Sequence, residues 1–236
     1  MSDFKVEFVE HIFSTPLVMF DVPDAKKLNK LIVAEARAWR DSSGSVEVSN
    51  KGDSWHSPEG LLSRKEPGFA KFSSMVPRMA GEYAKMINPA VNLSELSFEA
   101  SAWVNINRRG GFNAAHHHGT YHLSGVYYAQ QPKVKSGSGG MIEFYNSRFD
   151  YHIAEAIGGR AFVNAISVRP EAGKMVIFPS TLLHYVYPNE TDEERITLAW
   201  NIKFIKRTAS GPAVNKQSSQ NWKPKSTAKP TLNVLR

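Results

Sequence analysis

The chain has 236 residues, 42% of them apolar, which is enough for one well-buried core but short for two ordinary domains. It contains no cysteine, so disulfides, zinc fingers and iron–sulfur clusters are excluded, and any metal must be bound by nitrogen and oxygen atoms. The net charge of +7 lies in residues 206–236, which hold five Lys and two Arg and no acidic residue, so the preceding residues balance 22 basic against 22 acidic side chains.

The N-terminal ten residues carry Asp3, Lys5, Glu7 and Glu10 and do not resemble a secretory signal. No run of about 18 apolar residues is present, so we expect no membrane partner. The expectation is a soluble, cytoplasmic protein, which for a viral protein means the host cytoplasm.

Two amphipathic helices are predicted in the N-terminal half, over residues 24–41 and 67–87, because apolar residues recur there at the spacing of one helical face. Pro77 lies inside the second helix and is expected to kink or divide it. Core packing explains both apolar faces, so we interpret these helices as structural support.

After Asn88 the apolar pattern changes to a period of two, which predicts β-strands. Seven strands are expected, near residues 96–107, 123–129, 141–145, 161–168, 174–178, 184–187 and 195–204. Short strands with Gly- or Pro-containing turns between them favour a mainly β fold of the jelly-roll type, a cupin-like double-stranded β-helix, with the N-terminal helices flanking it.

The predicted organisation is therefore a single domain over residues 1–205 followed by a tail. Within the domain, residues 24–88 provide helical support and residues 96–205 form the jelly-roll core. Residues 206–236 are rich in Ser, Pro, Lys, Asn and Gln and are expected to form a flexible basic tail. That tail either increases solubility or contacts an acidic partner.

Alternation in the first and last predicted strands separates apolar from polar residues. The first strand places Trp103 and Asn105 on the face opposite its apolar side chains, and the last places Arg195, Thr197 and Asn201 together on one face. These faces suit the interior of a barrel mouth. An Arg on a buried face needs an anion or a carboxylate to offset its loss of water.

Three histidines form the candidate metal site. In an extended segment His116 and His118 project to one side and His117 to the other. His184 begins a later predicted strand and can supply a third ligand, and imidazole suits iron(II), zinc, copper and nickel. Histidines without a ligand role are the alternative, but a His pair, a later His and an inward-facing Arg together favour a metal site.

From Trp103 to Phe204 the sequence resembles the prolyl-hydroxylase-like 2-oxoglutarate and Fe(II)-dependent oxygenases, and specifically a bacterial and phage family among them. The motifs that carry the resemblance are Trp103-Val-Asn105, His116-x-His118, Ser124-Gly-Val-Tyr-Tyr128, Gly173-Lys-Met-Val-Ile-Phe-Pro179, His184 and Arg195-x-Thr197 leading to Asn201. The resemblance implies two facing sheets with an iron ion near one open end. It implies an enzyme that uses Fe(II), 2-oxoglutarate and O2 to hydroxylate a substrate, with release of succinate and CO2.

The resemblance also implies roles for individual residues. The implied metal ligands are His116, His118 and His184, and the implied cosubstrate site consists of Arg195, Thr197, Tyr127 and Asn105. Arg195 would pair with the distal carboxylate of 2-oxoglutarate.

One position departs from the superfamily pattern of His-x-carboxylate, because this chain has His-x-His. Three accounts are open: His118 replaces the carboxylate, Glu143 supplies one from a neighbouring strand, or His117 and Gly119 form a His-x-Gly site with a vacant position for halide. We favour the first, since His-x-His fits the narrower family pattern.

Two other classes of function compete with this interpretation. One is a non-catalytic, virion-like or carbohydrate-binding jelly roll with a structural metal, and the other is a three-His cupin-type dioxygenase that does not use 2-oxoglutarate. A structural metal site is a closed cage of four ligands, whereas this sequence offers three good ligands and an Arg with no acidic neighbour on its own face. Arg195 discriminates against the cupin-type enzyme, which has no need of it. The substrate is open among peptides, nucleobases, lipids and small molecules, and a homodimer is one open arrangement.

Overall fold

The computed structural model describes residues 14–148, 150–159 and 162–207, so the predicted tail lies outside the described residues from 208 onward. The helices are α1 (Ala25–Ser42), α2 (Pro67–Ile87), α3 (Tyr151–Ile157) and the short 3-10 turns η1 (Leu61–Ser63) and η2 (Leu93–Glu95). None of the helices in these ranges combines the length and the apolar character that crossing a membrane requires.

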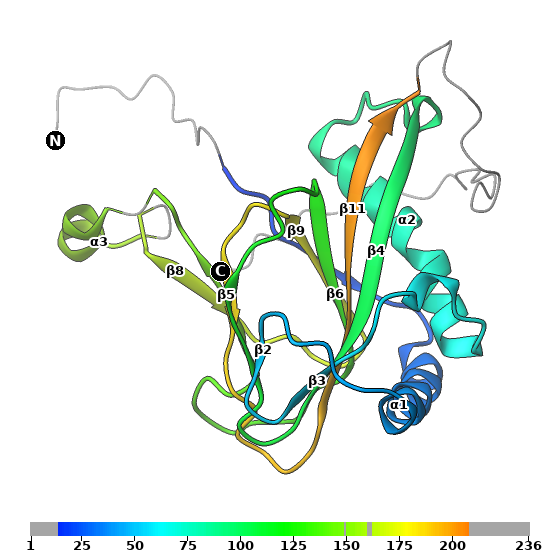
Figure 1. Ribbon diagram of the computed structural model, residues 1–236. Coiled ribbons are helices and arrows are strands. Elements are labelled where there is room, and N and C mark those ends of the chain that lie inside the picture. The colour runs from blue at the N-terminus through cyan, green and yellow to red at the C-terminus, as the bar shows by residue number, and fades with distance from the viewer. Residues whose placement is uncertain (1–13, 149, 160–161, 208–236) are drawn as a thin grey trace, which may run out of the picture. The chain divides into compact units, whose positions relative to one another are not determined.

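Two antiparallel sheets form the body of the fold (Figure 1). The six-stranded sheet has the order β1 (Val18–Asp21), β9 (Lys174–Pro179), β6 (Leu123–Gln130), β11 (Arg195–Lys206), β4 (Leu96–Asn107), β3 (Ser54–His56). The five-stranded sheet has the order β2 (Asn50–Lys51), β5 (Phe112–His116), β10 (His184–Val186), β7 (Ile142–Tyr145), β8 (Ala165–Val168). The predicted jelly roll with flanking helices is confirmed.

Both predicted helices and all seven predicted strands are present, with boundaries shifted by a few residues. The beginning of the strand expected at 161–168 lies partly outside the described residues. Strands β1, β2, β3 and β5, which are two to five residues long, were not predicted. Helix α2 is continuous through Pro77, so the proline does not divide it.

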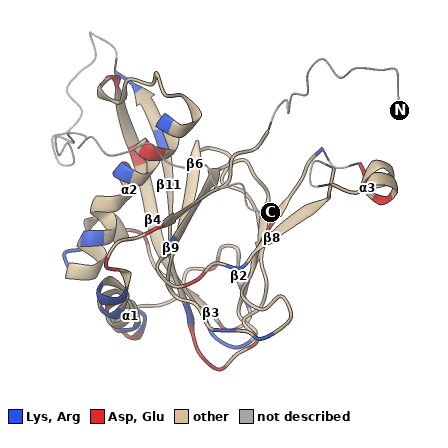
Figure 2. Cartoon of the chain, turned by 180° about the vertical axis from the view of Figure 1, so that it is seen from behind, with Lys and Arg blue, Asp and Glu red and all other residues tan. Residues whose placement is uncertain are grey.

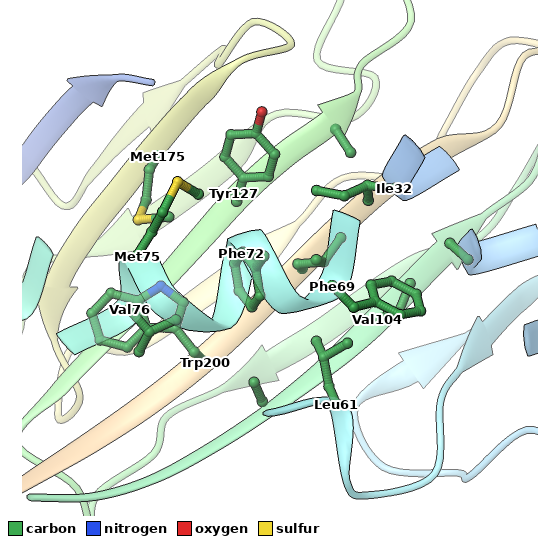
Figure 3. Packing of buried hydrophobic residues seen from close by; sticks show 14 of the residues in the cluster. Ile32, Leu61, Phe69, Phe72, Met75, Val76, Val104, Tyr127, Met175 and Trp200 are labelled. Carbon is green, nitrogen blue, oxygen red and sulfur yellow. The ribbon is translucent and has the colours of Figure 1, made fainter. Parts of the chain in front are cut away.

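The core lies in two layers, one on each face of the six-stranded sheet. The larger layer lies between this sheet and helices α1 and α2, and Figure 3 shows Phe69, Phe72 and Trp200 packed within it. The smaller layer lies between the sheets and includes Phe144 and Phe178. Because both faces of β11 are covered, its first eight residues are all buried, polar ones included.

Helix α1 is tied to the start of β11 by ion pairs. The carboxylate of Glu194 accepts hydrogen bonds from Arg37 Nε at 2.8 Å and from Arg40 Nη1 at 2.5 Å, and Arg108 Nε lies 3.3 Å away. Figure 2 shows further charged residues along α1 and α2. These contacts hold the helical layer against the strand that carries Arg195.

Candidate metal centre

Three imidazoles converge between the two sheets, as predicted. His116 ends β5, His184 begins β10, and His118 follows two residues after His116. Their ligand nitrogens all lie within 4.8 Å of one another. The ring centroids are 4.3 Å apart for His116 and His184, 5.0 Å for His116 and His118, and 5.4 Å for His118 and His184.

Backbone carbonyls orient two of these rings in the same way. His116 Nδ1 lies 2.6 Å from the Ala114 carbonyl oxygen, and His184 Nδ1 lies 2.9 Å from that of Leu182. Because a carbonyl oxygen can only accept, Nδ1 carries the proton in both rings and Nε2 keeps its lone pair, which in His116 lies 3.4 Å from the Ser49 hydroxyl oxygen. A hydrogen bond of this kind fixes the tautomer of a metal-ligating histidine.

The environment keeps the three rings neutral. Burial, and to a smaller extent the other histidines, lower the pKa of His184 to about 3 and that of His118 to about 4. Burial also lowers the pKa of His116. Neutral imidazole is the form that binds a metal ion, so protons do not compete for this site at neutral pH.

The other two accounts of the His-x-His departure are not supported. Glu143 pairs with Tyr185, the neighbour of His184, so its side chain lies on the opposite face of the sheet, where it accepts hydrogen bonds from Ser167 at 2.8 Å and Tyr187 at 2.9 Å. His117 is exposed, and its Nδ1 accepts a hydrogen bond from the backbone N–H of Gly119. In the described ranges, no carboxylate joins the three histidines.

A narrow cavity leads from the histidines to Arg195 and is also lined by Asn105, Thr197 and Asn201. Arg195 is only 2% exposed, its Nε has no hydrogen-bond partner, and none of the ion pairs among the described residues involves it. Burial lowers its pKa, and nearby Tyr128 offsets only part of that effect. A buried guanidinium without a carboxylate favours an anionic ligand in this cavity.

The prediction that Tyr127 faces this cavity is wrong. Its ring packs against Phe72 of α2 and its hydroxyl donates to Asn29 Oδ1 of α1 at 2.5 Å, so it belongs to the helical layer. Tyr128 lies on the other face of β6 beside Arg195, with the guanidinium carbon 5.3 Å from its ring centroid, and its hydroxyl is buried. Alternation with Ser124 could have identified Tyr128, because residues four apart in a strand share a face.

A larger cleft of about 770 Å³ adjoins the histidines on the other side. It is lined by all three of His116, His117 and His118 and by Trp103. His56 of β3, which was not among the predicted site residues, also lines it, and its ring stacks on Trp103 with centroids 5.5 Å apart and planes at 16°. The site thus has an enclosed end that contains the buried Arg195 and an open end at the larger cleft.

Comparison with known families matches residues 101–201 to the model described as "Putative 2OG-Fe(II) oxygenase". A search of curated proteins returned no match.

Solved structures share the fold at low sequence identity. A prolyl-4-hydroxylase from Pseudomonas putida is 17% identical with a TM-score of 0.55, covering 83% of this chain and 95% of that one. HygX from Streptomyces hygroscopicus, with nickel, 2-oxoglutarate and hygromycin B bound, is 12% identical with a TM-score of 0.57, covering 83% and 84%. A prolyl hydroxylase from Trichoplax adhaerens, in complex with a peptide fragment, is 12% identical with a TM-score of 0.55, covering 79% and 83%.

Proposed function

We propose that the chain is a 2-oxoglutarate and Fe(II)-dependent oxygenase, the family whose model matches residues 101–201, and that it hydroxylates a substrate with Fe(II), 2-oxoglutarate and O2. The observation that carries the proposal is that one cavity joins a neutral three-histidine cluster to a buried Arg195 without a carboxylate partner. A cation site beside an anion site is what binding of an iron ion and a dicarboxylic acid requires.

The histidine cluster suits Fe(II) in its donor atoms. His116, His118 and His184 would hold the ion through ring nitrogens, two of which are oriented by backbone hydrogen bonds. Three neutral ligands leave the full 2+ charge at the site, so anionic ligands are attracted more strongly than at a site with a carboxylate ligand.

The opposite end of the cavity suits the distal carboxylate of 2-oxoglutarate. Arg195 can pair with it through two parallel N–H groups. Thr197 lies two residues on, on the same face, and can donate its hydroxyl, and Tyr128 carries a second buried hydroxyl beside Arg195. Asn105, whose Oδ1 is buried without a hydrogen-bond partner, completes this polar lining.

When bound, Fe(II) and 2-oxoglutarate supply the oxidising chemistry that converts O2 and 2-oxoglutarate into succinate, CO2 and a hydroxylated substrate. The chain's own residues position the reactants and exclude water. Phe144 and Phe178 pack around the His184 ring, with centroids 6.1 Å and 4.9 Å away, which keeps the inner side of the cluster dry. The outer side faces the larger cleft, which is where a substrate can approach.

This arrangement disfavours the two competing functions. A structural metal site is a closed cage of four ligands, whereas the described residues supply three and the cluster borders an open cleft. A three-His dioxygenase that does not use 2-oxoglutarate has no need for the buried Arg195.

The test is an anaerobic titration of the metal-free chain with Fe(II) and then with 2-oxoglutarate, followed by visible absorbance. We expect a weak charge-transfer band on the second addition, and uncoupled succinate formation when air is admitted. Arg195→Ala should retain Fe(II) binding and lose the band. A band that is equally strong in Arg195→Ala, or Fe(II) binding with no band in the unsubstituted chain, would contradict the proposal.

A further inference from the structure

The larger cleft runs along the edge of a strand. Four consecutive residues of β4, Ala100 to Trp103, all line it. Successive side chains of a strand point to opposite faces of the sheet, so a cleft that touches four in a row must lie against the strand's edge, where the backbone N–H and C=O groups are.

The orientation of these backbone groups follows from the pairing of β4 with β3. Val104 accepts a hydrogen bond from Ser57 N–H at 2.9 Å, and its own N–H donates to Ser57 Oγ at 3.1 Å, so the backbone groups of Val104 point toward the β3 side. Residues two and four positions earlier in a strand repeat this orientation. The N–H and C=O groups of Ala102 and Ala100 therefore point to the same edge.

This part of the edge has no strand partner among the described residues. Strand β3 pairs only with residues 105–107 of β4, at one end of the strand (Figure 1). Pairing ends at Ser57, and Pro58, which has no N–H, follows it. Beyond that point β4 pairs with β11 on its other side alone.

An unpaired edge of this kind recognises a specific chemistry. It offers alternating donors and acceptors about 7 Å apart, the repeat of an extended polypeptide. The side chains at the edge are small, namely Ala100, Ser101 and Ala102, so a second backbone can approach closely. A sugar or a nucleobase has no matching repeat of donors and acceptors.

We propose that the substrate is an extended polypeptide segment that adds as an antiparallel strand to the β4 edge at residues 100–102, in line with β3. This inference rests on the proposed function, because it names the substrate class of the same site. A residue paired opposite Ser101 or Trp103 projects to the same face as they do. That face carries Trp103, whose ring lies 5.5 Å from His118, so the side chain would be directed toward the histidine cluster.

The experiment measures peptide binding to the full chain loaded with Fe(II) and 2-oxoglutarate without oxygen. An array of ten-residue peptides of varied sequence is the probe, and the peptides that bind are resynthesised with one N-methylated amide at a time. We expect N-methylation at every second position to weaken binding about tenfold and at the intervening positions to have little effect, since only alternate amides face β4.

Variants of the chain test the same edge. Ala100→Pro removes one edge N–H without removing a β4–β11 hydrogen bond, and should weaken peptide binding about tenfold. Ala100→Ser retains the N–H and is the matched control, with unchanged binding. If Ala100→Pro does not fold, the N-methyl scan on the unsubstituted chain still decides the question.

The outcomes separate this inference from the proposed function. Binding of Fe(II) and 2-oxoglutarate with no peptide bound, or with peptides insensitive to N-methylation, overturns strand addition and leaves the oxygenase proposal standing. If Fe(II) and 2-oxoglutarate do not bind, the oxygenase proposal is overturned. Strand addition can still be tested on the same sample, because peptide binding through backbone groups needs no metal.

Discussion

His184 lies directly opposite His116 in the antiparallel pairing of β10 with β5, with ring centroids 4.3 Å apart. The two residues are 68 positions apart in the chain, and strand register alone brings them together. A shift by one residue would place Tyr185 at this point and turn His184 to the outer face. The register of two short strands therefore determines whether the site exists.

Replacing His184 by alanine should lower Fe(II) affinity by at least about 100-fold. Loss of a partner that merely orients a ligand costs about 10- to 100-fold, and His184 would supply a ligand atom itself. Anaerobic calorimetric titration measures the effect. His117→Ala is the matched control, because His117 is exposed and turned away from the cluster. The Fe(II) affinity of this variant should equal that of the unsubstituted chain. Equal losses in both variants would contradict the ligand assignment.

Adjacent tyrosines should have separable roles. Tyr128→Phe removes the hydroxyl beside Arg195 and should weaken 2-oxoglutarate binding about tenfold, roughly 1.4 kcal/mol, with Fe(II) affinity unchanged. Tyr127→Phe removes the hydrogen bond to Asn29 and should lower the free energy of unfolding by about 1 kcal/mol, with 2-oxoglutarate binding unchanged. Cosubstrate titration and denaturant unfolding of both variants make the comparison, and an exchange of the two effects would refute the assignment.

Glu194 should make stability depend on pH in the acid range. Burial alone would raise its pKa, but hydrogen bonds from Arg37 and Arg108 and the charge of Arg40 lower it below the ordinary 4.5. A carboxyl group with a lowered pKa in the folded state stabilises the fold above 4.5, and this contribution is lost as the pH falls through the folded-state pKa.

Glu194→Gln should therefore reduce the free energy of unfolding at pH 7 by about 1 kcal/mol, a small value because Arg37 is 45% exposed and solvent screens the charges. The difference from the unsubstituted chain should shrink as the pH is lowered below 4. Thermal unfolding of both chains at a series of pH values measures this difference. A difference that grows toward acid pH would contradict a lowered pKa of Glu194.

Gly125 should not tolerate a side chain. It lies opposite Trp200 in the β6–β11 pairing, and a Cβ atom there would overlap the indole ring. Trp200 is fully buried and cannot move aside, so Gly125→Ala should cost about 1–3 kcal/mol of stability. Gly44→Ala, where a Cβ atom meets nothing within 4 Å, is the control and should change stability by less than about 0.5 kcal/mol.

Periodicity in the sequence was sufficient to locate α1, α2 and seven of the strands, because a buried face appears in the sequence as a repeat of apolar residues. The same alternation correctly placed Trp103 and Asn105 on one side of β4 and Arg195 and Thr197 on one side of β11. Tyr127 was assigned to the cosubstrate site although its alternation with Ser124 places it on the other face of β6, and its hydrogen bond to Asn29 of α1 shows that it belongs to the helical layer.

Spacing along the chain established the candidate ligands His116, His118 and His184, since residue type and local alternation depend on neighbours in the sequence. The distance between their nitrogens, the outward orientation of Glu143 and the free edge of β4 depend on which strands pair and in what register. Strand pairing joins segments far apart in the chain through backbone groups that every residue carries, so side-chain identities do not encode it locally.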